Sequence, residues 1–229
     1  LQPSSRVEGS LKPHLGEAKF DLQPVFSGER FGNVVVSMEG TIIATWGTSH
    51  GRARRSEDGG QTWGPEIVIA KPGFQPGGLT VNEANGDIIA FVEDRHPPAP
   101  IHVYVSSDDG KSWNKIETNI KPDSRGNAPS MHMNEHGITL RHGKHKGRLL
   151  MPSQVFVGSM NKDGSRTYLN KGQGRKYFGK RYSNALYSDD GGKTWRTSEP
   201  FPAFGTGEAT VAELSDGTVY YNSRRHWAE

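Results

Sequence analysis

The amino-acid sequence predicts an all-β fold, and three observations support this prediction. Turn-forming residues are frequent, with 29 Gly and 14 Pro among 229 residues, while only 32% of the residues are hydrophobic. Short β-rich runs alternate with turns rich in Gly, Asp and Asn, as in β-hairpins. No window keeps apolar residues at helical spacing for three turns. This pattern excludes a helical bundle.

The predicted strands form pairs that short turns connect. The pairs are residues 33–37 with 41–46, 79–82 with 88–92, 137–140 with 148–152, and 210–214 with 218–222, and a further run covers 101–106. Glycines at turn positions, such as Gly40, Gly86 and Gly217, favour tight connections. Each pair is therefore predicted to form a hairpin.

An eight-residue motif of the form Ser-x-Asp-x-Gly-x-Thr/Ser-Trp occurs three times, beginning at Ser56, Ser106 and Ser188. In each copy the Asp can accept hydrogen bonds from turn backbone, and the Gly can supply a left-handed conformation. The Trp of each copy is expected to begin the next strand and to pack into the local core. Each copy thus predicts a hairpin turn.

The spacing of these copies predicts the architecture. The first two begin fifty residues apart, which is the length of one four-stranded propeller blade with its connections. The longer interval before the third copy contains a polar, Gly- and Lys-rich stretch at 157–181, which we interpret as an inserted loop. Residues 1–229 are therefore predicted to be a single β-propeller domain.

The motif resembles the Asp box, or BNR repeat, of the sialidase (neuraminidase) family, which also occurs in binding and scaffold propellers. The resemblance extends from about Phe26 to Trp227. It implies a six-bladed propeller of four-stranded antiparallel blades, of which about three and a half lie in this chain. The missing C-terminal half is expected to carry a tyrosine nucleophile and a third arginine, so this chain alone should be catalytically incomplete.

Two segments resemble catalytic parts of that family. Glu208, in Gly-Thr-Gly-Glu, matches the residue that activates the tyrosine, and Arg224, in Asn-Ser-Arg, matches an arginine that holds the sugar carboxylate. Arg30 corresponds to the first carboxylate-binding arginine, although Phe31-Gly32 replaces the family's Ile-Pro. A guanidinium donates two parallel hydrogen bonds to a carboxylate. A Glu–Tyr pair avoids bringing a second anion to an anionic substrate.

The chain departs from the family at the acid/base aspartate. The corresponding loop, residues 47–51, contains no carboxylate. His50 and Asp94 are the candidate replacements, and a salt-bridged loop is the alternative interpretation for Asp94. His132 and His136 are candidate substrate-binding residues at the rim. Their spacing lacks a supporting helix or carboxylate pattern for a metal site, so no metal or other cofactor is predicted.

Composition and charge limit the classes of partner that the protein is expected to bind. A formal net charge of +3 without a recognised motif argues against nucleic acid. No stretch approaches the roughly 20 apolar residues that cross a membrane. The absence of cysteine excludes disulfides and thiolate metal sites. A sialylated or other acidic glycan is the expected partner. We expect a secreted or periplasmic protein, although this chain shows no signal peptide.

Three functions remain open from the sequence. The first is a retaining exo-sialidase that releases terminal sialic acid from sialosides. The second is a carbohydrate-binding propeller without turnover, which the absent aspartate favours. The third is a propeller hydrolase or lyase for another acidic sugar, with His50 or His136 as the proton-transfer residue.

Overall fold

The computed structural model describes residue 20, residues 22–156 and residues 181–225. Within these ranges the chain forms β-strands and one 3₁₀ turn, η1 (Gly143–His145), with no α-helix. The all-β prediction is therefore confirmed. Most of the insertion predicted at 157–181 lies outside the described residues.

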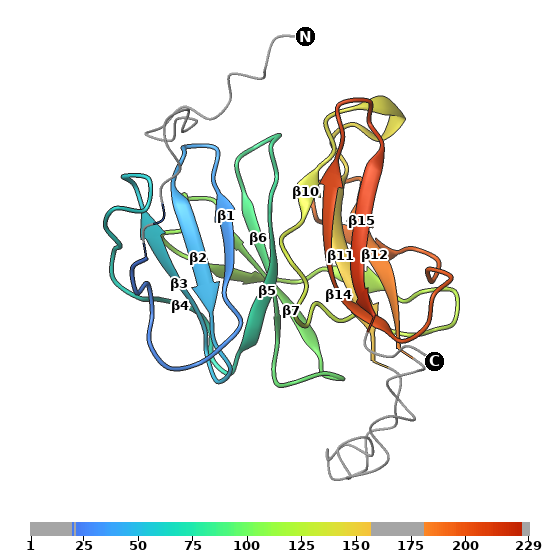
Figure 1. Cartoon of the computed structure of the whole chain (residues 1–229), viewed down its shortest axis with the longest axis horizontal. Helices are drawn as coiled ribbons and strands as arrows, with labels where there is room; N and C mark the ends of the chain where they lie inside the picture. The colour runs from blue at the N-terminus through green and yellow to red at the C-terminus, as the bar shows by residue number, and fades with distance from the viewer. Residues whose placement is uncertain (1–19, 21, 157–180, 226–229) are drawn as a thin grey trace.

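The first two sheets are consecutive four-stranded antiparallel units, as expected of propeller blades. Blade 1 contains β1 (Asn33–Val36), β2 (Ile42–Trp46), β3 (Gly51–Ser56) and β4 (Ile67–Ala70). Blade 2 contains β5 (Phe74–Val81), β6 (Ile88–Glu93), β7 (Ile101–Ser106) and β8 (Asn114–Ile116). Figure 1 shows the sheets side by side, with β5 in the middle of the fan.

Blade 3 adds one unexpected strand. Its antiparallel strands are β10 (Ile138–Thr139), β11 (Leu149–Val155), β12 (Tyr182–Ser188) and β13 (Thr194–Thr197). On the outside, β9 (Asn119–Lys121) pairs in parallel with β13. Blade 4 is a hairpin of β14 (Thr206–Glu213) and β15 (Val219–Arg225) in the described part of the chain.

All three Asp boxes form the predicted turn, each between the third and fourth antiparallel strands of a blade. In the second box, Asp108 accepts the Ser112 backbone N–H at 2.9 Å and the Ser106 hydroxyl at 2.7 Å. The Gly110 N–H donates to the Ser106 hydroxyl at 2.8 Å, and Gly110 has the left-handed φ of 79°. Self-contained hydrogen bonds explain why this turn recurs in blades 1, 2 and 3.

The core lies between adjacent blades. One cluster joins blade 1 to blade 2, with Ile43 and Ile88 among its fully buried members. A second joins blade 2 to blade 3, where the Trp195 ring meets Phe91 edge-on at 4.9 Å between centroids. Trp195 is buried as predicted, whereas Trp63 and Trp113 are only partly buried and precede their strands.

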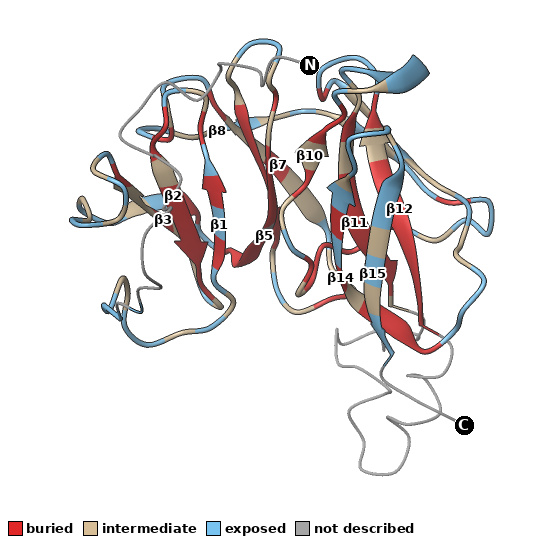
Figure 2. Ribbon diagram, turned by 45° about the horizontal axis from the view of Figure 1, so that its top comes forward, coloured by how far each residue is buried: buried red, intermediate tan, exposed pale blue. Residues whose placement is uncertain are grey.

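Burial falls along the last hairpin. Figure 2 shows β2 and β12 largely buried, while β15 carries exposed and intermediate residues along its length. In the described part of the chain β15 pairs only with β14, so its outer edge is open. No helix among the described residues is long and apolar enough to cross a membrane.

Candidate active site

One end of the blades collects most of the residues singled out from the sequence. The loop after β2 bonds to the start of β5, because the Gln75 N–H donates to the Gly47 carbonyl at 2.8 Å. The start of β12 bonds to the start of β14, because the Ser183 N–H donates to the Thr206 hydroxyl at 3.0 Å. The same end of the blades therefore contains the C-terminal residues of β2, β6, β11 and β15. It also contains the residues that precede or begin β1, β5 and β14.

Glu208 and Arg224 form an ion pair at this end of blade 4. The Arg224 Nη1 lies 2.7 Å from Glu208 Oε2, and the Glu208 side chain is 19% exposed. Glu208 lies within β14, and a β-bulge falls between Thr206 and Ala209. Bulges redirect side chains and are frequent beside active sites. The bulge therefore explains how a strand residue is aimed at the end of the blade.

Arg30 lies above a cluster of rings that joins three blades. Its guanidinium carbon is 4.8 Å from the centre of the Phe31 ring. The rings, which we call the ring cluster, contact one another at centroid distances from 4.4 to 5.7 Å, and they are Phe31, Phe74, His96, His132 and Phe156. Arg181 packs over Phe156 at 3.8 Å. Arg30 of blade 1 and Arg181 of blade 3 thus both contact the ring cluster.

Left-handed backbone conformations recur beneath the ring cluster. Phe31, Gln75 and Met133 have φ of 69°, 43° and 56°, and each is a member of the cluster or follows one. Such values are unfavourable for residues with large side chains and concentrate at functional sites. Gly205 supplies the same conformation before β14, with φ of 73°.

His50 lies on the short loop after β2, where Glu29 anchors the backbone. The His50 Nδ1 is 2.9 Å from the Ser49 hydroxyl, which in turn donates to Glu29. The Ser49 hydrogen bond lowers the pKa of Glu29 to about 2, and bonds from Thr48 and Arg52 add to the effect against the opposing cost of burial. This carboxylate is ionised at neutral pH and acts as an anchor.

Asp94 is engaged in an ion pair beside the site. Its Oδ1 is 2.8 Å from His102 Nε2, and both side chains are 29% exposed. This contact supports the salt-bridged interpretation of the loop that follows β6. The same loop brings His96, which was not singled out from the sequence, into the ring cluster.

The two candidate histidines of blade 3 lie in different places. His132 is 5% exposed and belongs to the ring cluster. His136 lines a cavity of about 770 Å³ between the inner strands, together with Val34 of β1 and Val211 of β14. The structure therefore does not bring His132 and His136 together. No group of three or more His, Asp or Glu side chains suited to a metal occurs among the described residues.

Two tyrosines near the site are held inside the blades. Burial raises the pKa of Tyr182 to about 12, and its hydroxyl donates to Asp123. Burial also raises the pKa of Tyr221, whose hydroxyl donates to the Asn184 carbonyl at 2.9 Å. Both phenols are therefore engaged in hydrogen bonds within the blades.

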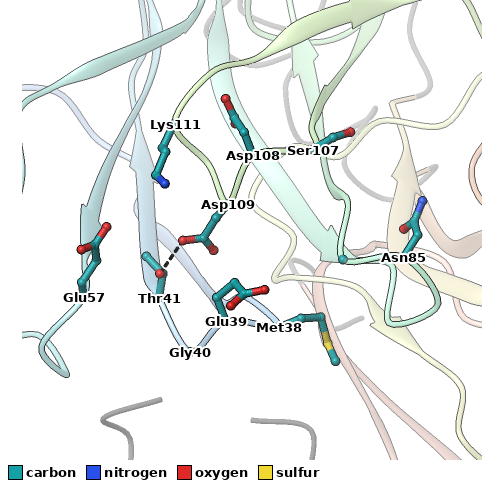
Figure 3. A pocket seen from close by; sticks show the side chains of 11 residues that line it. Met38, Glu39, Gly40, Thr41, Glu57, Asn85, Ser107, Asp108, Asp109 and Lys111 are labelled. Atoms are coloured by element: carbon teal, nitrogen blue, oxygen red, sulfur yellow. Dashed lines mark hydrogen bonds between the residues drawn. The ribbon is translucent and has the colours of Figure 1, made fainter. Parts of the chain in front are cut away.

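A second cavity of about 540 Å³ lies at the opposite end, beside the second Asp box (Figure 3). Its lining includes Glu39, Asp108 and Lys111, and the Thr41 hydroxyl donates to Asp109 at 2.6 Å. Asp109 also forms an ion pair with Arg55, whose Nη2 lies 2.6 Å from Asp109 Oδ2. Asp109 thus connects blades 1 and 2, and we place the candidate site at the other end of the blades.

Several residues of the site were missed from the sequence. Phe74, His96, Phe156 and Arg181 come from four separate segments, and no local motif connects them. The only signal was their shared position beside strand ends. Glu208 and Arg224, sixteen residues apart in the sequence, are brought together by the hairpin of β14 and β15.

Fold and repeated turn together define an Asp-box β-propeller, and comparisons with known proteins agree. Residues 186–197 match the BNR/Asp-box repeat family. The chain is 28% identical over 264 residues to a sialidase of Micromonospora viridifaciens, covering 97% of this chain and 38% of that protein. The chain is thus similar to a sialidase over nearly its whole length, and it spans well under half the length of this relative.

Solved structures support the same fold. A Hadza microbial sialidase superimposes with a TM-score of 0.60 and 21% identity, covering 85% of this chain and 42% of that one. The intramolecular trans-sialidase from Ruminococcus gnavus superimposes with a TM-score of 0.62 and 12% identity, covering 88% of this chain and 66% of that one. At these identities the likeness shows the fold.

Proposed function

We propose that this chain is part of a retaining exo-sialidase that releases terminal sialic acid from sialosides. The observation that carries the proposal is the Glu208–Arg224 pair, 2.7 Å apart, at the blade end where Arg30 also lies. Arg30 and Arg224 would bind the substrate carboxylate through charged hydrogen bonds. Glu208 would take the proton of a tyrosine that attacks the anomeric carbon. The sialidase of M. viridifaciens supports this assignment.

We further infer that the complete protein is a six-bladed propeller, with the nucleophile and a third arginine in blades that follow β15. Among the described residues β15 pairs with β14 alone, which supports this inference, since two more strands would complete blade 4. Either His50 or Asp94 would serve as the proton donor. We also propose that the protein is exported, since its substrate would be a glycan outside the cell.

A carbohydrate-binding propeller without turnover is the second candidate. It is favoured by the loop at 47–50, which has no carboxylate, and by the engagement of Asp94 with His102. In this case the two arginines would hold the sugar, and no residue would protonate the leaving group.

The substitution Glu208→Gln in the full-length protein separates these candidates. If Glu208 activates the nucleophile, kcat on sialyllactose falls by about 10²–10⁴-fold, while the calorimetric Kd stays near that of the wild type. Glu39→Gln, on an exposed turn at the opposite end, is the matched control and should retain activity. Unchanged turnover in Glu208→Gln would rule out the assigned role, and binding without turnover in the wild type would favour the second candidate.

A further inference from the structure

Asn134 lies at the point where three blades meet. Its side chain is 2% exposed, and it occupies the turn between the ring cluster residue His132 and β10. Burying an amide is costly unless its hydrogen bonds are replaced. The partners of Asn134 therefore show what this buried polar group holds in place.

Two hydrogen bonds connect this turn to the bulged strand of blade 4. The Ala209 N–H donates to Asn134 Oδ1 at 2.9 Å. The next residue of the turn, Glu135, donates its N–H to the Ala209 carbonyl, also at 2.9 Å. Ala209 directly follows Glu208 and marks one end of the β-bulge. These bonds therefore fix the backbone that aims Glu208 at the site.

The opposite side of Asn134 contacts blade 1 and the ring cluster. Asn33 Nδ2 donates to the Asn134 carbonyl at 3.3 Å, and Asn33 opens β1 three residues after Arg30. The Asn134 Nδ2 is 3.4 Å from the Ser130 carbonyl and 3.5 Å from the His132 carbonyl. One side chain and its own peptide thus connect the segments that carry Arg30, His132 and Glu208.

We propose that Asn134 is a positioning residue that sets the separation of Arg30 from the Glu208–Arg224 pair. The proposal rests on the proposed function, in which both arginines bind one carboxylate. Without the amide, β14 would keep its pairing with β15 and the Glu135–Ala209 hydrogen bond, but the Ala209 N–H would lose its bond to Asn134. Glu208 and Arg224 would then shift together relative to Arg30. A displacement of about 1 Å in such a site costs roughly 10²-fold in rate.

The test compares Asn134→Ala with Asn82→Ala in the full-length protein. Asn82 is also buried, at 4% exposure, and its Oδ1 accepts the Ala84 N–H at 3.0 Å. It lies at the Asp-box end of blade 2, so it controls for the loss of a buried amide away from the site. Steady-state kinetics on sialyllactose are measured well below the melting temperature of each variant.

We expect kcat/KM of Asn134→Ala to fall about 100-fold, with a rise in KM of at least about tenfold. Asn82→Ala should stay within about twofold of the wild type. The rise in KM is decisive, because partial unfolding reduces the concentration of active enzyme but leaves KM unchanged. A wild-type KM and kcat for folded Asn134→Ala would overturn the proposal.

Two further measurements distinguish failure of the positioning role from failure to fold and from failure of the proposed function. If Asn134→Ala does not fold, Asn33→Ala removes only the contact from β1, and KM should still rise severalfold; a wild-type KM there overturns the proposal. If the wild type does not hydrolyse the sialoside, the proposed function fails, and calorimetric affinity for free sialic acid replaces KM. Equal affinity in the wild type and Asn134→Ala, or no binding in the wild type, then overturns the positioning role.

Discussion

Arg224 and Arg225 are adjacent on β15, and side chains at successive positions of a strand point to opposite faces. This geometry places Arg224 beside Glu208 and directs Arg225 away from it. A difference in KM between substitutions at the two positions therefore shows whether Arg224 has a specific part in substrate binding. A lysine keeps the charge but lacks the planar fork that matches a carboxylate.

We predict that Arg224→Lys raises KM for sialyllactose by about 10- to 100-fold, the equivalent of one charge-assisted hydrogen bond. Arg225→Lys is the matched control and should change KM less than about twofold. Initial-rate kinetics of both variants provide the comparison. Equal effects at the two positions would mean that Arg224 has no special part in binding.

Glu29 gives a prediction about acid stability. Its pKa is lowered from 4.5 to about 2 in the folded protein, chiefly by the Ser49 hydroxyl. A folded pKa below the unfolded value adds stability above pH 4.5, and this contribution is lost as the pH falls toward 2. Glu29→Gln should therefore flatten the decline of the melting temperature across this window.

Melting curves recorded between pH 5 and pH 2 test this prediction. Only part of the decline should disappear, because the pKa values of Asp58 and Asp108 are also lowered to about 2 by the hydrogen bonds of their Asp boxes. A slope identical to that of the wild type would show that the Glu29 anchor does not contribute.

At the scale of elements, the contact between β13 and β6 holds neighbouring blades together. Trp195 is fully buried against Phe91, and its indole N–H donates to the Gly192 carbonyl at 3.0 Å. We predict that Trp195→Ala lowers the free energy of unfolding by about 3–5 kcal/mol, as expected for a large core truncation. Urea unfolding measures the change.

Val68 is the control for this experiment, since it is 54% exposed on the outer strand β4. Val68→Ala should change stability by less than about 0.5 kcal/mol. A loss below about 1 kcal/mol for Trp195→Ala would contradict the view that Trp195 holds blades 2 and 3 together.

The sequence was sufficient to predict those elements that local rules determine. The Asp boxes were predictable because each turn satisfies its own hydrogen bonds, as Asp108 does with Ser106 and Ser112. The hairpin of β14 and β15 followed from turn chemistry around Gly217. In contrast, the parallel strand β9 has only three residues and no pattern, so its pairing depends on tertiary contacts.

At the scale of the whole molecule, the repeat predicted the order of the blades along the chain. It did not predict which side chains of different blades come into contact. The ring cluster joins residues of three blades, such as Phe31, His96 and Phe156, whose contacts no local pattern reveals. Asn134 is a single buried amide whose importance appears only when its partners are known. Glu208 and Arg224 became candidate site residues because a family resemblance supplied the long-range information.

The central claim is that this blade end forms a sialidase active site in the complete protein. Proton NMR of sialyllactose mixed with the full-length protein tests it most directly, because the anomeric form of the first product is visible. We predict free sialic acid that appears first as the α-anomer, as a retaining mechanism through a covalent intermediate requires. Line broadening of the ligand without any hydrolysis, or the β-anomer appearing first, would contradict the account.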